Sequence, residues 1–205
     1  MKRSATYRPL RSGSMIVNAT TERPGTLGCI ARDNQGAAWI VSCYHVLARV
    51  KGAISEFQDN EEIWQSTAEQ GGSKVAVTAT AMADERLDVA AARVLDDVDV
   101  CGDVLELHDV KGVGRAVEGM RVLKSGADTG VTEGTVTEVV GSLVTIGVAE
   151  HMPREYVLCD HGDSGAIWMD ANTGLGVAIH FAGRNGDTAF ARDLATALQR
   201  LGLHL

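Results

Sequence analysis

A serine between glycines stands in the segment LCDHGDSGAIW, residues 158–168. Ser164 lies between Asp163 and Gly165, and Gly162 precedes it by two positions. Glycines permit backbone angles that residues with a Cβ resist, and they let another molecule approach the main chain. A tight turn between strands explains these residue types equally well. The chemical alternative is a nucleophilic serine beside backbone N–H groups, which requires a base and a residue that orients the base.

Two other residues are candidates for the base and its orienting partner. His45, in SCYHVLA, directly follows an apolar, β-rich run. Asp88, in RLDVAAARV, stands at the head of an apolar segment, where a buried carboxylate is costly unless it is paired. A structural histidine and an aspartate at a strand end explain each residue singly. In the order His45, Asp88, Ser164, the three residues together predict nucleophilic catalysis at a serine.

Short β-rich segments separated by glycine and polar turns must position these residues. Strands are expected at 26–33, 37–42, 74–82, 87–95, 120–125, 134–140, 142–149, 155–160, 165–170 and 175–183. The first two flank Asn34-Gln35-Gly36 and predict a hairpin. The alanines of residues 87–95 also leave a helix open there.

Helices are expected at only two places. Residues 43–50 predict a short helical turn, and Phe190, Leu194, Leu198 and Leu201 recur at helical spacing. Gly202 stands where a helix C-cap is expected. Residues 51–73, with an apolar island at Ile63 and Trp64, are expected to be mostly loop, and residues 96–118 a linker.

The length and composition predict one globular domain, or two small lobes that share a core, and they argue against several classes of partner. The chain has 205 residues, of which 45% are apolar, enough for a hydrophobic core. Its net charge of −8 does not favour nucleic acid or anionic membranes. No apolar run is long enough to span a membrane, and the opening MKRSATYRPLRS is not typical of a secretory signal.

The four cysteines, at positions 29, 43, 101 and 159, include no C-x-x-C pair. We expect them, Cys29 and Cys43 included, to be free thiols of a cytoplasmic protein. His151, His161 and His180 scatter near Cys159 and Asp160 without the spacing of a metal site. We expect no metal and no cofactor.

The ordered residues give the chain a resemblance to the chymotrypsin-fold (trypsin-like) serine peptidases, in particular a bacterial branch that looks intracellular. The matching motifs are GTLGCIARDNQGAAWIVSCYHVLA, LDVAAARV, VLKSGADTGVTEGTVTEV and GDSGAIW, and the resemblance runs from about residue 25 to the end. It implies an all-β fold of two six-stranded antiparallel β-barrels with a C-terminal helix. In a single peptidase domain over 1–205, the barrels are expected at about 20–100 and 118–190, and the helix at about 191–201.

The resemblance also implies roles for named residues. Ser164 would attack a carbonyl carbon, His45 would act as base and acid, and Asp88 would orient His45. The backbone N–H groups of Gly162 and Ser164 would form the oxyanion hole. The resemblance further implies an ion pair of Asp163 with a newly cut amino terminus, but the chain lacks Ile-Val-Gly-Gly at a cleavage point. We therefore expect Asp163 to find another partner in the second barrel, without N-terminal activation.

The same resemblance places a specificity pocket around Leu158, Cys159, Asp160 and His180. Leu158, at the floor position, offers no partner for Lys or Arg. The strand LGVAIHFAG resembles the GIHxGG strand of glutamyl endopeptidases, with Ala182 in place of one glycine. His180 thus indicates acidic or small residues before the scissile bond, although an inward-pointing Asp160 would repel acidic ones. A structural role for His180 stays open.

Alternative functions fit the same residues. The segment lacks the final glycine of the G-x-S-x-G elbow, and the order Ser, Asp, His of α/β-hydrolases is not seen. A catalytically weak scaffold for protein binding, or an esterase-type serine hydrolase, remains open. The expected partners are a protein or peptide substrate and a possible regulatory protein, with no nucleic acid and no membrane.

Overall fold

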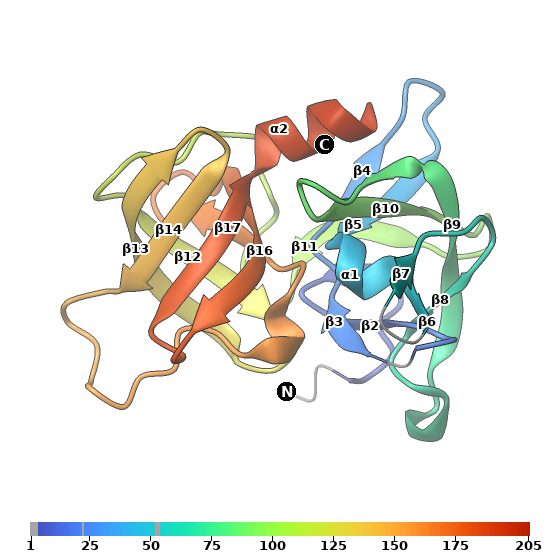
Figure 1. Ribbon diagram of the computed structural model, residues 1–205, viewed down its shortest axis with the longest axis horizontal. Coiled ribbons are helices and arrows are strands. Elements are labelled where there is room, and N and C mark those ends of the chain that lie inside the picture. Colours follow the sequence, from blue (N-terminus) through green and yellow to red (C-terminus); the bar gives the residue numbers. More distant parts are fainter. Residues whose placement is uncertain (1–3, 22, 52–53) are drawn as a thin grey trace.

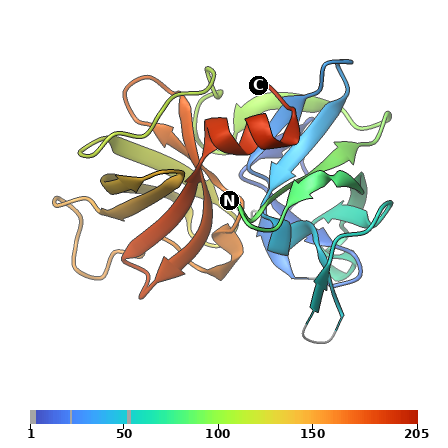
Figure 2. The same cartoon turned by 45° about the horizontal axis from the view of Figure 1, so that its top comes forward.

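The computed structural model describes residues 4–21, 23–51 and 54–205. Two β-rich units lie side by side, and the C-terminal helix α2 (Leu194–Leu201) lies along one side of both (Figures 1 and 2). We call residues 10–104 the first unit and residues 121–193 the second unit. No helix in the described part of the chain is long and apolar enough to cross a membrane.

The first unit is a seven-stranded sheet that curls on itself. Its strand order is β3-β2-β8-β9-β10-β5-β4. The bounds are β2 (Met15–Asn18), β3 (Pro24–Thr26), β4 (Cys29–Arg32), β5 (Ala38–Ser42), β8 (Glu62–Gln65), β9 (Ser73–Asp84) and β10 (Val89–Val94). The edge strands β3 and β4 are consecutive in the chain, with only Leu27 and Gly28 between them, so the two edges of the sheet lie close together.

Smaller elements complete the first unit. They are β1 (Leu10–Ser12), β6 (Arg49–Lys51), β7 (Ile54–Glu56), β11 (Val100–Val104), helix α1 (Tyr44–Leu47) and the 3-10 turn η1 (Ala68–Gln70). Strand β1 pairs in parallel with β11, and β6 pairs with β7. Helix α1 starts two residues after β5, so the sheet fixes the position of the helix.

The second unit is a closed six-stranded barrel with the order β12-β13-β14-β17-β16-β15. Its elements are β12 (Arg121–Gly126), β13 (Gly130–Val140), β14 (Leu143–Val148), the 3-10 turn η2 (His161–Asp163), β15 (Ile167–Asp170), β16 (Gly176–Arg184) and β17 (Thr188–Asp193). All neighbouring strands are antiparallel. Closure pairs every strand on both sides, so the barrel has no free edge.

Alternating side chains of the strands fill separate hydrophobic clusters. In β5, Ile40 packs into the core of the first unit, whereas Trp39 and Val41 face a second cluster between the units. That second cluster also holds Ile179 of the barrel and Leu198 of α2. The two units are therefore joined by a shared core, as the period of two along a strand allows.

The observed elements confirm the all-β fold with two β-units and a C-terminal helix. The hairpin around Gly36 and the helical turn after residue 43 form as expected, and residues 87–95 contain the strand β10 and no helix. The first unit differs in one respect: it is an open, curled seven-stranded sheet, because its edge strands β3 and β4 do not pair.

Two expected elements are wrong. The strand expected at 155–160 is a turn followed by irregular chain, because the neighbours Leu158 and Cys159 are both buried in the barrel core and do not alternate as in a paired strand. The terminal helix starts at Leu194, and Phe190 belongs to strand β17. The side chain of Asp193 accepts a hydrogen bond from the Thr196 N–H, which fixes this start. Gly202 ends the helix in the left-handed conformation, as expected.

Candidate active site

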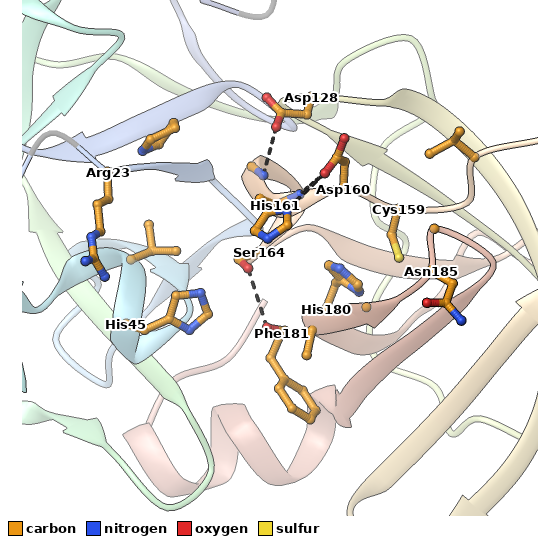
Figure 3. A pocket seen from close by; sticks show the side chains of 17 residues that line it. Arg23, His45, Asp128, Cys159, Asp160, His161, Ser164, His180, Phe181 and Asn185 are labelled. Carbon is orange, nitrogen blue, oxygen red and sulfur yellow. Dashed lines mark hydrogen bonds and ion pairs between the residues drawn. The ribbon is translucent and has the colours of Figure 1, made fainter.

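A pocket of about 770 Å³ opens between the two units. His45 lines it from the first unit, and Ser164 and His180 line it from the second (Figure 3). Residues that are 119 positions apart along the chain thus border one cavity. The fold brings the candidate base and the candidate nucleophile to the same space.

His45 and Asp88 form a direct pair. The ring Nδ1 of His45 lies 2.8 Å from Oδ2 of Asp88, and the backbone N–H of His45 donates to Oδ1 of Asp88 at 3.1 Å. Helix α1 presents His45, and Asp88 directly precedes β10. Asp88 has a φ of +54°, a left-handed conformation that is uncommon for residues other than glycine but favoured severalfold by Asp and Asn. The two contacts fix the plane of the imidazole ring.

Ser164 caps the C-terminal end of the 3-10 turn η2 and is 7% exposed. Its Oγ lies 3.5 Å from the carbonyl oxygen of Phe181, a contact drawn as a dashed line in Figure 3. The carbonyl oxygen of Ser164 accepts a hydrogen bond from the N–H of Thr26 at 2.8 Å. The serine is therefore held from both units.

Gly165 allows the close approach of the units behind the serine. It has a φ of +99°, and a Cβ at this position would collide with the Ser42 hydroxyl and the Thr26 carbonyl oxygen. Its N–H donates to the carbonyl oxygen of His180 at 2.8 Å. Only glycine fits both requirements, which explains this residue of the Gly-Asp-Ser-Gly segment.

The N–H of Gly162, a candidate oxyanion donor, already has a partner. It donates to Oδ2 of Asp128 at 2.9 Å, one of the dashed contacts in Figure 3. Asp128 lies in the turn between β12 and β13, and it also lines the pocket. In this conformation the N–H of Gly162 faces a carboxylate of the protein itself.

Asp163 is fully buried and paired with a lysine of the second unit. Its Oδ2 lies 2.7 Å from Nζ of Lys124 and accepts the hydroxyl of Thr129 at 2.6 Å. Both side chains of the ion pair are 0% exposed. Burial alone would raise the pKa of the Asp163 carboxyl, but the Lys124 ammonium and the hydrogen bonds hold it below its usual range. The expectation of a partner for Asp163 in the second barrel is confirmed.

The residues expected around the specificity pocket do not all meet there. Cys159, Asp160 and His180 line the cavity, whereas Leu158 packs into the barrel core. Asp160 is exposed and bonds the ring and the backbone N–H of His161. Its carboxylate therefore lies at the pocket rim, paired with a neighbour.

His180 is buried in an uncharged state. Burial lowers the pKa of His180 to about 3, and the nearby Lys124 ammonium adds to the shift. Its ring packs edge-on against Trp168 with centroids 6.2 Å apart. Its Nδ1 is buried without a hydrogen-bond partner among the described residues. A buried nitrogen without a hydrogen-bond partner costs about 1–3 kcal/mol.

One group of potential metal ligands occurs among the described residues: Cys43, His45 and Asp88, whose ligand atoms lie within 4.8 Å of one another. Here His45 and Asp88 already bond each other. Burial raises the pKa of the Cys43 thiol, and the thiol donates to the carbonyl oxygen of His180. A neutral, bonded thiol is a poor ligand, because metals bind the thiolate.

All four cysteines are free thiols, as expected.

Two residues of the site were missed from the sequence. Lys124 gives a weak signal, because Val122 and Lys124 alternate with Arg121 and Leu123 in β12 and so share the inward face. A lysine on that face requires a buried anion. Asp128 gives no signal beyond a polar turn between glycines. Its contact with Gly162 joins residues 34 positions apart.

Comparison with known proteins rests on structure alone. No protein-family model matches the chain, and no curated protein sequence matches it. Solved structures match over nearly the full length. A glutamic-acid-specific serine protease superposes with a TM-score of 0.72 at 20% identity, covering 96% of this chain and 100% of that one. Thermobifida fusca protease A gives 0.71 at 16% identity, covering 95% and 97%.

A third neighbour is a chymotrypsin of Cellulomonas bogoriensis, with a TM-score of 0.68 at 19% identity and coverage of 95% and 97%. These neighbours are serine proteases by name. The chain therefore has the fold of the trypsin-like serine peptidases, as its sequence motifs suggested.

Proposed function

We propose that the chain is a serine endopeptidase that cleaves peptide bonds through His45, Asp88 and Ser164. The observation that carries the proposal is the 2.8 Å contact of His45 Nδ1 with Asp88, at a pocket that Ser164 also lines. A histidine oriented by a carboxylate is the base that a serine nucleophile requires. The fold of known serine proteases supports protein or peptide substrates.

The proposed mechanism follows from this orientation. With Nδ1 of His45 donating to Asp88, Nε2 is left as the atom that can take the Ser164 proton. The Oγ of Ser164 then attacks the carbonyl carbon of the substrate, and His45 passes the proton to the leaving amine. In the second half of the reaction, His45 takes a proton from water, the water attacks the acyl carbon, and His45 returns the proton to the Ser164 Oγ as the acid product leaves. The N–H groups of Gly162 and Ser164 would stabilise the negative oxygen formed at each step.

Two observations support the rival function of a protein-binding scaffold. The Gly162 N–H that the mechanism needs is bonded to Asp128, and the Ser164 Oγ is directed at Phe181. A scaffold that has lost catalysis has no need of a free donor. An esterase-type hydrolase would use the same serine and histidine.

A random peptide library incubated with the purified protein and with its Ser164→Ala variant tests the proposal. We expect cleavage by the wild type and none by the variant. Little cleavage is expected after Lys or Arg, because the carboxylate of Asp160 at the pocket rim is already bonded to His161 and a buried cation would lack a partner. Cleavage by neither protein supports the scaffold, and hydrolysis of esters alone supports the esterase.

We further propose acidic or small residues before the scissile bond. The structurally similar glutamic-acid-specific protease uses a histidine triad in substrate binding, and here His45, His161 and His180 line the pocket. His45 pairs with Asp88, and His161 is exposed and bonded to Asp160, so His180 is the candidate for contact with an acidic side chain. Because its pKa is about 3, His180 is neutral at pH 7 and offers a ring N–H, not a positive charge. A hydrogen bond to a carboxylate is stronger than one to a neutral acceptor.

His180→Ala is expected to reduce kcat/KM on acidic substrates roughly tenfold, in line with the loss of one charge-assisted hydrogen bond. Substrates with alanine before the scissile bond should be affected less than threefold. Matched Glu and Ala peptides compared in one assay measure the ratio. An equal loss on both peptides would instead assign His180 a structural role beside Trp168.

The four free thiols support a reducing compartment. We propose a cytoplasmic location on this ground.

A further inference from the structure

The carboxylate of Asp128 occupies the backbone donor that catalysis needs. We propose that Asp128 is an autoinhibitory latch, an internal anion that holds the Gly162 N–H away from the substrate until it is displaced. The inference rests on the proposed peptidase function, and it concerns the regulation of the same site. Its starting point is the 2.9 Å hydrogen bond from Gly162 to Oδ2 of Asp128.

The Asp128 carboxylate has the same negative charge as the oxyanion that it would exclude from Gly162. The tetrahedral intermediate places a negative oxygen at the Gly162 and Ser164 N–H groups. A carboxylate is likewise a negative oxygen, and it forms a charge-assisted bond with an N–H. One N–H cannot serve both anions in the same direction. Asp128 and the developing oxyanion therefore compete for Gly162.

The turn that carries Asp128 is firmly anchored. The backbone N–H groups of Asp128 and Thr129 both donate to Oδ1 of Asp163 at 3.1 Å. The Thr129 hydroxyl and Lys124 bind the other carboxylate oxygen of Asp163. The buried ion pair thus holds the base of the latch in place, and release requires only movement of the Asp128 side chain or of the adjoining Gly162 peptide.

Gly162 is suited to such a movement. It lies within the 3-10 turn η2 and is not among the glycines with positive φ, so its present backbone angles do not require glycine. What excludes a side chain here is Asp128 itself, since a Cβ would lie 2.6 Å from the carboxylate carbon. Glycine also makes other backbone conformations accessible at little cost. The residue is compatible with a bonded and a released state.

Substrate binding can shift the equilibrium from the bonded to the released state of the Gly162 N–H. Asp128 is an exposed residue, so its carboxylate can return to water when it leaves Gly162. Binding energy from remote parts of a substrate can drive such a rearrangement. Extended peptides should therefore displace the latch, whereas a small ester with few contacts should not.

Asp128→Ala tests the latch through substrates of different length. We expect kcat/KM on a small amino-acid ester to rise roughly threefold to tenfold, the value of one hydrogen bond. On an extended peptide, whose binding has already displaced the latch, kcat should rise less than twofold and the gain should appear as a lower KM. Asp187→Ala is the matched control, because Asp187 is an exposed acid next to the pocket-lining Gly186 and does not bond Gly162. It should leave both rates unchanged.

A second measurement does not depend on activity. In Ser164→Ala protein labelled with ¹⁵N-glycine, Asp128→Ala should shift the Gly162 amide signal upfield and speed its hydrogen exchange. If the wild type cleaves peptides but Asp128→Ala is equally or less active on the ester, the latch is refuted. If no variant has any activity, the peptidase proposal fails, and an unchanged Gly162 amide would independently refute the contact.

Discussion

Ser164→Ala is expected to lower kcat for peptide hydrolysis roughly 10,000-fold to 1,000,000-fold, the range for loss of a serine nucleophile. The variant lacks the atom that would form the proposed acyl-enzyme. Removal of the Ser164 hydroxyl, which lies 3.5 Å from its acceptor, should leave the fold intact. Steady-state kinetics and a thermal unfolding curve on the same preparation separate the two effects.

Variants at His45 and Asp88 should also lose peptidase activity, and these losses should not add to the loss in Ser164→Ala. His45→Ala removes the base, and the double variant Ser164→Ala/His45→Ala should be hardly slower than either single one, because the residues act as a unit. Asp88→Ala should likewise abolish most activity. Asp88→Asn is the sharper change, because Asn tolerates the φ of +54°. An Asp88→Asn enzyme as fast as the wild type would refute the assignment.

Strands β12, β13 and β14 of the second unit were well predicted because their side chains alternate and the three strands pair with their neighbours in the chain. Strands β12, β13 and β14 follow one another through short turns, and each reads as a period-two pattern around Val122, Val136 and Ile146. Strands β1, β2, β6, β7, β8, β11 and β17 were missed. They are three to six residues long, and β11 pairs with the distant strand β1, so the local sequence carries little of the signal.

The residues of the candidate site that could be predicted from the sequence are those that lie in recognisable motifs. His45, Asp88 and Ser164 each lie beside an apolar run, and the fold brings His45 and Asp88 into contact. The contacts of Asp128 and Lys124 were not predictable, because they depend on how a turn and a strand of the barrel meet η2. Leu158 shows the converse: its place six residues before Ser164 suggested a pocket floor, but the structure buries it in the core.

Lys124 is the residue whose loss should affect stability most. Lys124→Met keeps much of the side-chain volume and leaves the fully buried Asp163 without its cation. Breaking a buried pair in this way typically lowers the free energy of unfolding by about 3–5 kcal/mol. Lys74→Met is the matched control, because Lys74 pairs with Glu62 at the surface, 3.1 Å apart and with both side chains more than a third exposed. It should change stability by less than about 1 kcal/mol.

The double variant Lys124→Met/Asp163→Asn distinguishes the loss of one charge from the loss of the contact itself. It removes both charges, and the amide oxygen can still accept the N–H groups of Asp128 and Thr129. Much of the lost stability should therefore return, since a buried pair contributes little net free energy. Urea unfolding at pH 7 measures all four proteins. Stability of the double variant as low as that of Lys124→Met would contradict this account of the pair.

Acid should remove any excess stability of the wild type over the double variant Lys124→Met/Asp163→Asn. The pKa of Asp163 is lower in the folded protein than its usual value, so the ion pair contributes its full stability above the unfolded pKa of about 3.9. That contribution is lost as the pH falls through the lowered folded pKa. The difference in unfolding free energy between the two proteins should be constant from pH 5 to 7 and should shift against the wild type below about pH 4. A difference that stays constant down to pH 2 would show that Asp163 does not titrate as an ion-paired carboxylate.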